Sequence, residues 1–212
     1  MVLNRELFER RLRLYAPHPE LILHRLRYWV WSRMHPNEPW LTPGAVAYLR
    51  SHLTNGMVGL EWGSGRSTAW YAHRIKRLTS VEHHSGWYHD VKSKLAAARV
   101  SNVDYRLVPL EHPENEPTVP EYDPVPRYVA VVHEVGAEPL DFVVVDGHYR
   151  QACVRAVTPK IRPGGLLLVD DSSRLSDLAQ WGVPRDWAVT HQSSNGLKTT
   201  TVWQKPLERE RP

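Results

Sequence analysis

The feature that most constrains this chain is a small-residue turn between an apolar run and a helix-compatible run. The apolar residues 57–60 end in Glu61, the turn Gly63-Ser64-Gly65 follows, and residues 67–72 suit a helix. Glycine lets the backbone adopt positive φ and lets a ligand approach without a Cβ in the way. The first amides of the helix then face that ligand. This order predicts a strand, a tight loop and a helix.

A second acid closes the next apolar run. Glu82 follows residues 78–81, roughly 20 residues after the glycines, at the position that binds ribose hydroxyls in nucleotide-binding folds. The glycine turn and Glu82 together indicate a site for a nucleoside-bearing cofactor.

From Met57 onward, predicted strands and helices alternate. We expect strands at 57–61, 78–82, 103–108, 141–146 and 166–170. We expect helices between them at 66–76, about 86–98, 127–135 and 149–159. Nearly unbroken apolar strands in this alternation favour a parallel sheet covered on both faces. The runs 187–191 and 198–203 flank Ser194-Asn195-Gly196, which predicts an antiparallel hairpin at the end of the sheet.

The first 55 residues predict a helical extension. Residues 3–15 and 20–34 have helical spacing, and Thr42-Pro43 begins a third helix with a capping hydroxyl followed by proline. We therefore divide the chain into an extension at 1–55, a cofactor-binding domain at 56–205 and a frayed tail at 206–212.

Composition narrows the class of protein. The formal charge of +4 and the pI of about 9.3 are mildly basic, and Cys153 is the single cysteine, which excludes an internal disulfide framework. No run reaches the ~20 apolar residues that span a bilayer, and the N-terminus has no apolar signal region. We expect a cytoplasmic protein. Many arginines lie in the first forty residues, either as a solvated helix face or as a surface for nucleic acid, anionic lipid or a phosphorylated substrate.

The strand pattern, the terminal hairpin and the run Glu61-Trp62-Gly63-Ser64-Gly65 resemble the class I S-adenosylmethionine-dependent methyltransferases over about residues 57–204. The resemblance implies a Rossmann-like doubly wound α/β fold, mostly parallel, with S-adenosylmethionine as the cofactor. Ser67 stands where that family commonly has a third glycine. The cofactor-binding positions that the resemblance implies are Glu61, Gly63, Ser64, Gly65, Ser67, Glu82 and Asp146.

Three acids close neighbouring strands of the implied sheet. Asp146 follows the fourth strand, and Asp170 and Asp171 follow the fifth. Carboxylates that converge at the carboxyl ends of strands suit Mg²⁺ or a similar hard cation. The pattern is similar to divalent-metal-dependent O-methyltransferases acting on sugars and catechols, in which acids at these positions hold the metal. The alternative is that these aspartates cap helices or accept loop amides.

His148 is the candidate general base because it lies two residues after Asp146 and imidazole titrates near neutral pH. A surface or capping histidine is the competing interpretation. Arg150 either positions an acceptor carboxylate or phosphate or lies in solvent at a helix start.

We therefore expect an S-adenosylmethionine-dependent methyltransferase that O-methylates a small hydroxylated or sugar-like acceptor, with Asp146 and His148 in catalysis. A nicotinamide-dependent oxidoreductase is one alternative. A non-catalytic interaction protein is another, with N-terminal helices docked on a partner or a membrane surface through Trp29 and Trp31. Those tryptophans otherwise pack against the sheet or a second subunit of a homodimer. No nucleic-acid partner is expected, since the sequence lacks a basic–aromatic RNA-reading motif.

Overall fold

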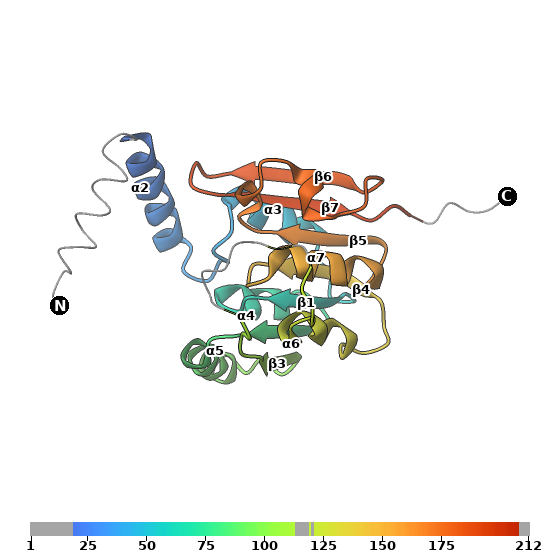
Figure 1. The fold of residues 1–212 in the computed structure, drawn as a ribbon. Helices are drawn as coiled ribbons and strands as arrows, with labels where there is room; N and C mark the ends of the chain where they lie inside the picture. Colours follow the sequence, from blue (N-terminus) through green and yellow to red (C-terminus); the bar gives the residue numbers. More distant parts are fainter. Residues whose placement is uncertain (1–18, 113–118, 120, 208–212) are drawn as a thin grey trace.

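The computed structural model describes residues 19–112, 119 and 121–207. Seven strands form one sheet in the order β3-β2-β1-β4-β5-β7-β6 (Figure 1). They are β1 (Val58–Trp62), β2 (Arg77–Glu82), β3 (Val103–Leu107), β4 (Leu140–Val145), β5 (Ile161–Val169), β6 (Ala188–Ser194) and β7 (Thr199–Gln204). Strands β1 to β5 run parallel, and β7 is antiparallel to both β5 and β6. The predicted doubly wound, mostly parallel fold with a terminal hairpin is confirmed.

The structure describes six α-helices, of which the last four lie between the strands as the alternation predicts. They are α2 (Pro19–Met34), α3 (Pro43–His52), α4 (Arg66–Ala72), α5 (Ser85–Ala97), α6 (Arg127–Ala130) and α7 (Arg150–Val157). Short 3₁₀ turns occupy Val131–His133, Thr158–Lys160, Ser172–Arg174 and Leu178–Trp181. The helix predicted at 3–15 and most of the tail predicted at 206–212 lie outside the described residues.

Helix α4 ends four residues before the predicted position 76. The reason is that Lys76 directly precedes β2, and its amide already donates to the carbonyl of Met57 at 2.8 Å. The amides of Arg74 and Ile75 still bond to Tyr71 in a tightening turn. The pairing of β1 with β2 therefore sets the end of this helix.

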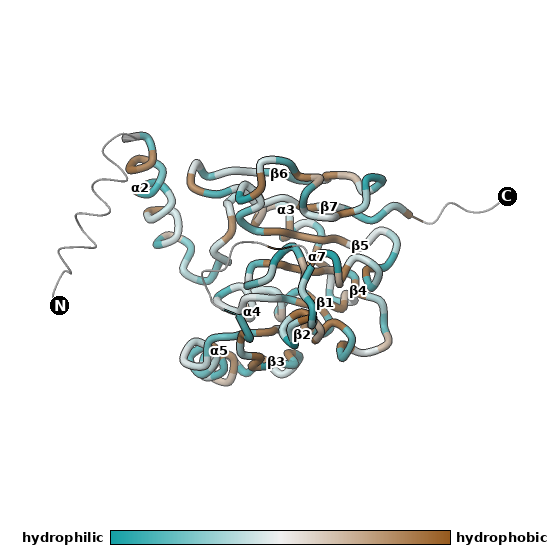
Figure 2. Tube along the Cα trace, in the orientation of Figure 1, coloured by the Kyte–Doolittle hydropathy of each residue, from teal (hydrophilic) through white to brown (hydrophobic). Residues whose placement is uncertain are grey.

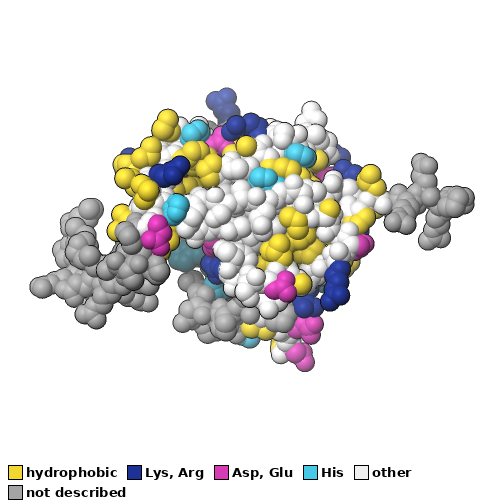
Figure 3. Space-filling model, turned by 90° about the horizontal axis from the view of Figure 1, so that it is seen from above, with side chains coloured by type: hydrophobic (Ala, Val, Ile, Leu, Met, Phe, Trp, Pro, Cys, Tyr) yellow, Lys and Arg dark blue, Asp and Glu magenta, His cyan; other side chains and the backbone are white. Residues whose placement is uncertain are grey.

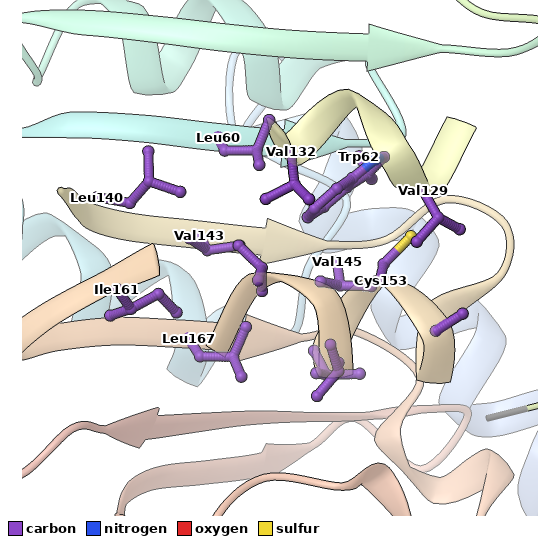
Figure 4. Packing of buried hydrophobic residues seen from close by; sticks show 14 of the residues in the cluster. Leu60, Trp62, Val129, Val132, Leu140, Val143, Val145, Cys153, Ile161 and Leu167 are labelled. Carbon is purple, nitrogen blue, oxygen red and sulfur yellow. The ribbon is translucent and has the colours of Figure 1, made fainter. Parts of the chain in front are cut away.

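The core has two halves, one on each face of the sheet. Val143 and Val145 of β4 pack with α6 and α7, whereas Phe142 and Val144 pack with α3 and α4. Figure 4 shows the first half, in which Trp62 and Cys153 lie close to Val129 and Val145. Hydrophobic residues line the central strands in Figure 2. Burial on both faces explains why these strands read as apolar runs instead of alternating ones.

Strand β5 begins earlier than predicted. The sequence Pro163-Gly164-Gly165 was expected to precede the strand, but β5 starts at Ile161 and passes through these residues with a register shift against β4. Gly164, with φ of +76°, donates to the carbonyl of Lys205, and the amide of Lys205 donates to Gly165. Contacts with the chain after β7 therefore extend the strand across an irregular segment.

Helix α2 stands apart from the helices that cover the sheet and lies beside the β6–β7 hairpin (Figure 1). Trp31 is half-buried and stacks on Tyr28 and His35, but Trp29 is 54% exposed, so the expected packing of Trp29 is not seen within one chain. Side chains of α2 make up the apolar patch at the left of Figure 3. Its exposed apolar residues are Ile22, Leu23, Leu26, Trp29, Val30 and Met34. Among the described residues, no helix is long and apolar enough to cross a bilayer.

Candidate active site

The glycine loop joins β1 to α4 and packs against the loop after β4. Gly63 has φ of +92°, and a Cβ built there would lie 2.7 Å from the amide nitrogen of Gly147 and 2.8 Å from the carbonyl carbon of Asp146. Only glycine satisfies both the backbone conformation and this close approach. Gly63 is therefore required by the fold, and it brings Asp146 next to the loop.

Gly65 differs from Gly63 because no described part of the chain requires it to be glycine. Its backbone is extended, and a Cβ built there would meet its nearest atoms, in Ser67 and Trp87, only at 3.9 Å. The space beside it lies next to Arg66, whose guanidinium stacks 4.9 Å from the Trp40 ring. One buried nitrogen of that guanidinium, Nη1, has no hydrogen-bond partner among the described residues. A glycine with no close contact around its Cβ position and a buried guanidinium nitrogen without a partner among the described residues thus belong to adjacent residues.

Glu82 ends β2 and is 3% exposed. Its carboxylate accepts hydrogen bonds from the Ser64 hydroxyl at 2.6 Å and from the amides of His83 and His84 at 2.9 Å each. The Ser64 hydroxyl is also 2.7 Å from the Tyr105 hydroxyl on β3. Ser64 and Glu82, which the sequence analysis places in one site, are brought together by these contacts.

Glu61 is fully buried at the end of β1 instead of facing the open side of the loop. Its carboxylate accepts from Ser67, from Thr68 at 2.7 Å and from Ser80 at 2.7 Å. Burial raises the pKa of Glu61 to about 7, although the three hydroxyl donors oppose that shift. Glu61 and Ser67 thus join β1, β2 and α4, and direct contact of either with a cofactor stays a prediction.

Asp146 follows β4, and its carboxylate lies 3.0 Å from Nη2 of Arg150. Partial burial and the nearby charge of Asp170 raise the pKa of Asp146 above its usual range, while Arg150 and Lys198 oppose the rise. The Arg150 guanidinium also donates to the backbone carbonyls of Gly147 and Asp146 at 2.9 Å each and to that of Asp170. Arg150 is therefore a buried clamp between two loops, which corrects both roles considered for it above.

The acidic pair after β5 is also bound by cations of this chain. Asp170 is 1% exposed and accepts from Lys198 and from the Thr200 hydroxyl at 2.6 Å. Asp171 lies 3.2 Å from Arg174 and 3.9 Å from Arg150. The three aspartates predicted as metal ligands do meet at one edge of the sheet, but each is paired with an arginine or a lysine.

This arrangement does not fit a divalent cation. Three carboxylates would need open lone pairs directed at one point, whereas Lys198, Arg150 and Arg174 already supply positive charge to them. No group of three or more histidine, cysteine, aspartate or glutamate side chains is placed to hold a metal ion in the described part of the chain.

His148 lies at the carboxyl edge of the sheet, on the side where β2 ends. Its ring centroid is 5.2 Å from that of His83, which follows β2, and 5.7 Å from that of Tyr149. It therefore approaches the site from the β2 side, opposite to Asp170 and Lys198. Its role as a base stays a prediction.

Four residues of this edge were missed or misread from the sequence: Tyr28, Arg66, Arg150 and Lys198. The Tyr28 hydroxyl donates to the carbonyl of Leu41 at 3.1 Å, and burial together with Asp170 and Asp146 raises its pKa. A lysine two residues after a hairpin glycine carries no sequence signal, because only the pairing of β5 with β7 brings it to Asp170. Arg66 was signalled only by its position directly after Gly65.

The sheet order, the glycine loop and the terminal hairpin define the fold of a class I S-adenosylmethionine-dependent methyltransferase. The chain belongs to this class, since a family model described as a methyltransferase domain matches residues 60–172 of the 212. None of the curated proteins matches the sequence. The oxidoreductase alternative thereby loses its support.

Solved structures agree with this fold. A methyltransferase-like protein from Silicibacter pomeroyi is 25% identical, with a TM-score of 0.59 over 82% of this chain and 91% of that one. A putative O-methyltransferase from Klebsiella pneumoniae is 18% identical, with a TM-score of 0.58 over 81% and 86%. An rRNA methylase from Streptococcus thermophilus is 13% identical, with a TM-score of 0.57 over 76% and 93%. The last two are similar to this chain in fold alone.

Proposed function

We propose that this methyltransferase binds S-adenosylmethionine at the glycine loop and O-methylates a small hydroxylated acceptor at the adjoining aspartates. The observation that carries the proposal is the open space at Gly65 beside the unpaired Nη1 of Arg66. Glycine at a position with room for a side chain is explained by a ligand that passes close to the backbone. A buried unpaired guanidinium nitrogen is explained by an anionic group of that ligand.

The chain offers complementary groups to both ends of the cofactor. Arg66 would bind the carboxylate of the methionine part, and Glu82 would accept from the ribose hydroxyls once Ser64 turns toward Tyr105. When bound, S-adenosylmethionine supplies a methyl group on a positively charged sulfur. Trp40 and Trp87, whose ring centroids are 6.2 Å apart, would shield this part of the site from water.

An acceptor hydroxyl must lose its proton as its oxygen bonds to the methyl carbon and the carbon–sulfur bond breaks. Asp146 is suited to receive that proton because its carboxylate is 32% exposed at the edge of the site while Arg150 fixes its orientation. His148 is the second candidate for this role. The products are the methyl ether and S-adenosylhomocysteine, with the proton on the base.

We propose that no metal takes part, contrary to the Mg²⁺ that the resemblance implies. The ion pairs of the three aspartates support this, because a cation would have to displace Lys198 and Arg174. The positive charge that a metal would bring to this edge comes instead from side chains of the chain itself.

Calorimetric titration with S-adenosylhomocysteine, with and without Mg²⁺, tests both parts. We expect binding of equal affinity in the two conditions and no binding of NAD. Gly65→Ala should weaken binding by about tenfold or more, equivalent to about 1.4 kcal/mol. The matched control is Gly56→Ala, since a Cβ at Gly56 meets nothing within 4 Å and the residue lies outside the glycine loop. Absence of binding to the wild-type protein would refute the proposed cofactor, and binding only with Mg²⁺ would restore the metal.

A further inference from the structure

A cavity lies beside the candidate active site and shares Tyr28 with it. It has a volume of about 580 Å³ and lies between α2, the start of α3 and residues 193–196 of the β6–β7 turn. We propose that this cavity holds the methyl acceptor and selects a small ring compound that carries an anionic carboxylate or phosphate. The inference rests on the proposed function and specifies its substrate class.

One wall of the cavity is aromatic. The rings of Tyr28 and Trp31 stack with centroids 5.7 Å apart and an angle of 12° between their planes. Two nearly parallel stacked rings present aromatic surface to the cavity, which matches an aromatic or sugar ring better than it matches a flexible chain.

The charge of the lining is positive. Arg27 is the lining residue with a permanent charge, and none of the residues that line the cavity is acidic. A guanidinium binds carboxylate and phosphate through paired hydrogen bonds. A lining with a positive charge and no acidic residue favours an anionic group on the ligand.

The turn of the hairpin contributes a hydrogen-bond donor. The side-chain oxygen of Asn195 accepts from the amides of Leu197 and Lys198 at 3.0 Å each, which fixes the orientation of the amide group. Its nitrogen, Nδ2, is buried and has no partner among the described residues. An unpaired buried donor is unfavourable, and an anionic oxygen of a ligand in the cavity would satisfy it.

The cavity is joined to the aspartates through Tyr28. The Tyr28 hydroxyl bonds to Leu41, and the next amide, that of Thr42, reaches the Thr200 hydroxyl at 3.4 Å. Thr200 in turn donates to Asp170. Asp170 and Asp146 also act electrostatically on the Tyr28 hydroxyl, so a ring held against Tyr28 would lie near these two aspartates.

The test uses the full chain saturated with S-adenosylhomocysteine and three probes: 4-hydroxybenzoate, phenyl phosphate and the neutral 4-hydroxybenzyl alcohol. Binding is followed by calorimetry and ligand-observed NMR. We expect at least one anionic probe to bind about tenfold more tightly than the alcohol, a difference typical of a charge-assisted hydrogen bond. The two anions show whether carboxylate or phosphate is preferred.

Arg27→Gln should remove the preference for the anion, and Asn195→Ala should weaken both anionic probes, while affinity for S-adenosylhomocysteine is retained. The control is Arg33→Gln, which removes a charge from the same helix outside the cavity lining and should change neither affinity. Equal binding of the neutral and anionic probes, binding of none of them, or an unchanged preference in Arg27→Gln would overturn the inference. So would tighter binding of a single-stranded RNA oligonucleotide that is lost in Arg27→Gln. Loss of S-adenosylhomocysteine binding in the wild-type protein would instead contradict the proposed function.

Discussion

Lys198, just beyond the turn of the β6–β7 hairpin, forms an ion pair with Asp170 at the carboxyl end of β5. The same ammonium donates to the carbonyl of Trp40, which belongs to the segment that joins α2 to α3. Since Asp170 is 1% exposed and Lys198 is 18% exposed, the pair is largely withdrawn from water. It links three separate parts of the chain at the edge where the aspartates gather.

Removal of this lysine should destabilise the fold. Lys198→Ala leaves a buried carboxylate with only Thr200 as its side-chain partner in the described part of the chain, and breaking a buried pair in this way typically costs about 3–5 kcal/mol. Chemical denaturation measures the loss. The double variant Lys198→Met/Asp170→Asn should recover most of it, and a double variant no more stable than Lys198→Ala would mean that the lysine acts through packing alone.

Mg²⁺ should leave the thermal midpoint of the wild-type protein unchanged, because each aspartate is already paired with a cation. In Lys198→Ala the carboxylates of Asp170 and Asp146 become available, and millimolar Mg²⁺ should raise the midpoint by binding the folded state. Differential scanning fluorimetry with Mg²⁺ and with a chelator checks both statements. A wild-type midpoint that rises with Mg²⁺ would show that the ion pairs yield to the metal.

Glu61 should make the stability depend on pH. Its pKa is about 7 in the folded protein and 4.5 without burial, so its favourable contribution is complete below pH 4.5 and is lost as the pH rises through 7. The loss is on the order of 3 kcal/mol, from about 1.4 kcal/mol for each unit of pKa. Unfolding free energies at pH 5 and pH 8 should differ more in the wild type than in Glu61→Gln. Equal differences in the two proteins would mean that the Glu61 carboxylate is not shifted.

Arg150→Gln should destabilise the protein much more than Arg174→Gln. Arg150 is buried and holds three backbone carbonyls and Asp146, whereas Arg174 is 55% exposed and contacts Asp171 from solvent. We expect a loss of about 3 kcal/mol for the first variant and well under 1 kcal/mol for the second. Parallel urea denaturation of the two variants measures the difference. Similar losses of stability would contradict the role of Arg150 in holding the two loops together.

Gly63→Ala should be poorly tolerated. A Cβ at this position meets backbone atoms of Asp146 and Gly147 below 3 Å, and the residue has φ of +92°. We expect the free energy of unfolding to fall by at least about 2 kcal/mol, because neither the steric contact nor the strained φ can relax without moving the loop after β4. Gly65→Ala, at an open position with extended backbone, is the matched control and should retain the stability of the wild type.

The sequence predicted the sheet well because its signals are local. Apolar runs such as 141–146 end in acids, and glycine turns separate them from helices, so the strand order followed from the resemblance. The end of α4 and the start of β5 were misplaced, since pairing with Met57 and with Lys205 decides them. Those partners are distant in sequence, and no local pattern encodes them.

The site was predicted in part for the same reason. The acids Glu82, Asp146 and Asp170 mark strand ends, which local patterns locate. Their partners could not be inferred, because Lys198 reaches Asp170 across 28 residues and Arg150 reaches two loops at once. The resemblance implied a metal where the chain supplies its own cations.

The short turn between β6 and β7 serves two purposes within four residues, since Asn195 lines the cavity and Lys198 holds Asp170. The proposed acceptor preference and the stability of the sheet edge therefore depend on residues three positions apart. A homologue or a laboratory variant that acquires a new acceptor by changing this turn would have to do so around a fixed lysine. Lengthening the turn before Lys198 would move that lysine away from Asp170 and destabilise the edge of the sheet. A change of acceptor should therefore arise by replacement of residues 193–196 and not by insertion.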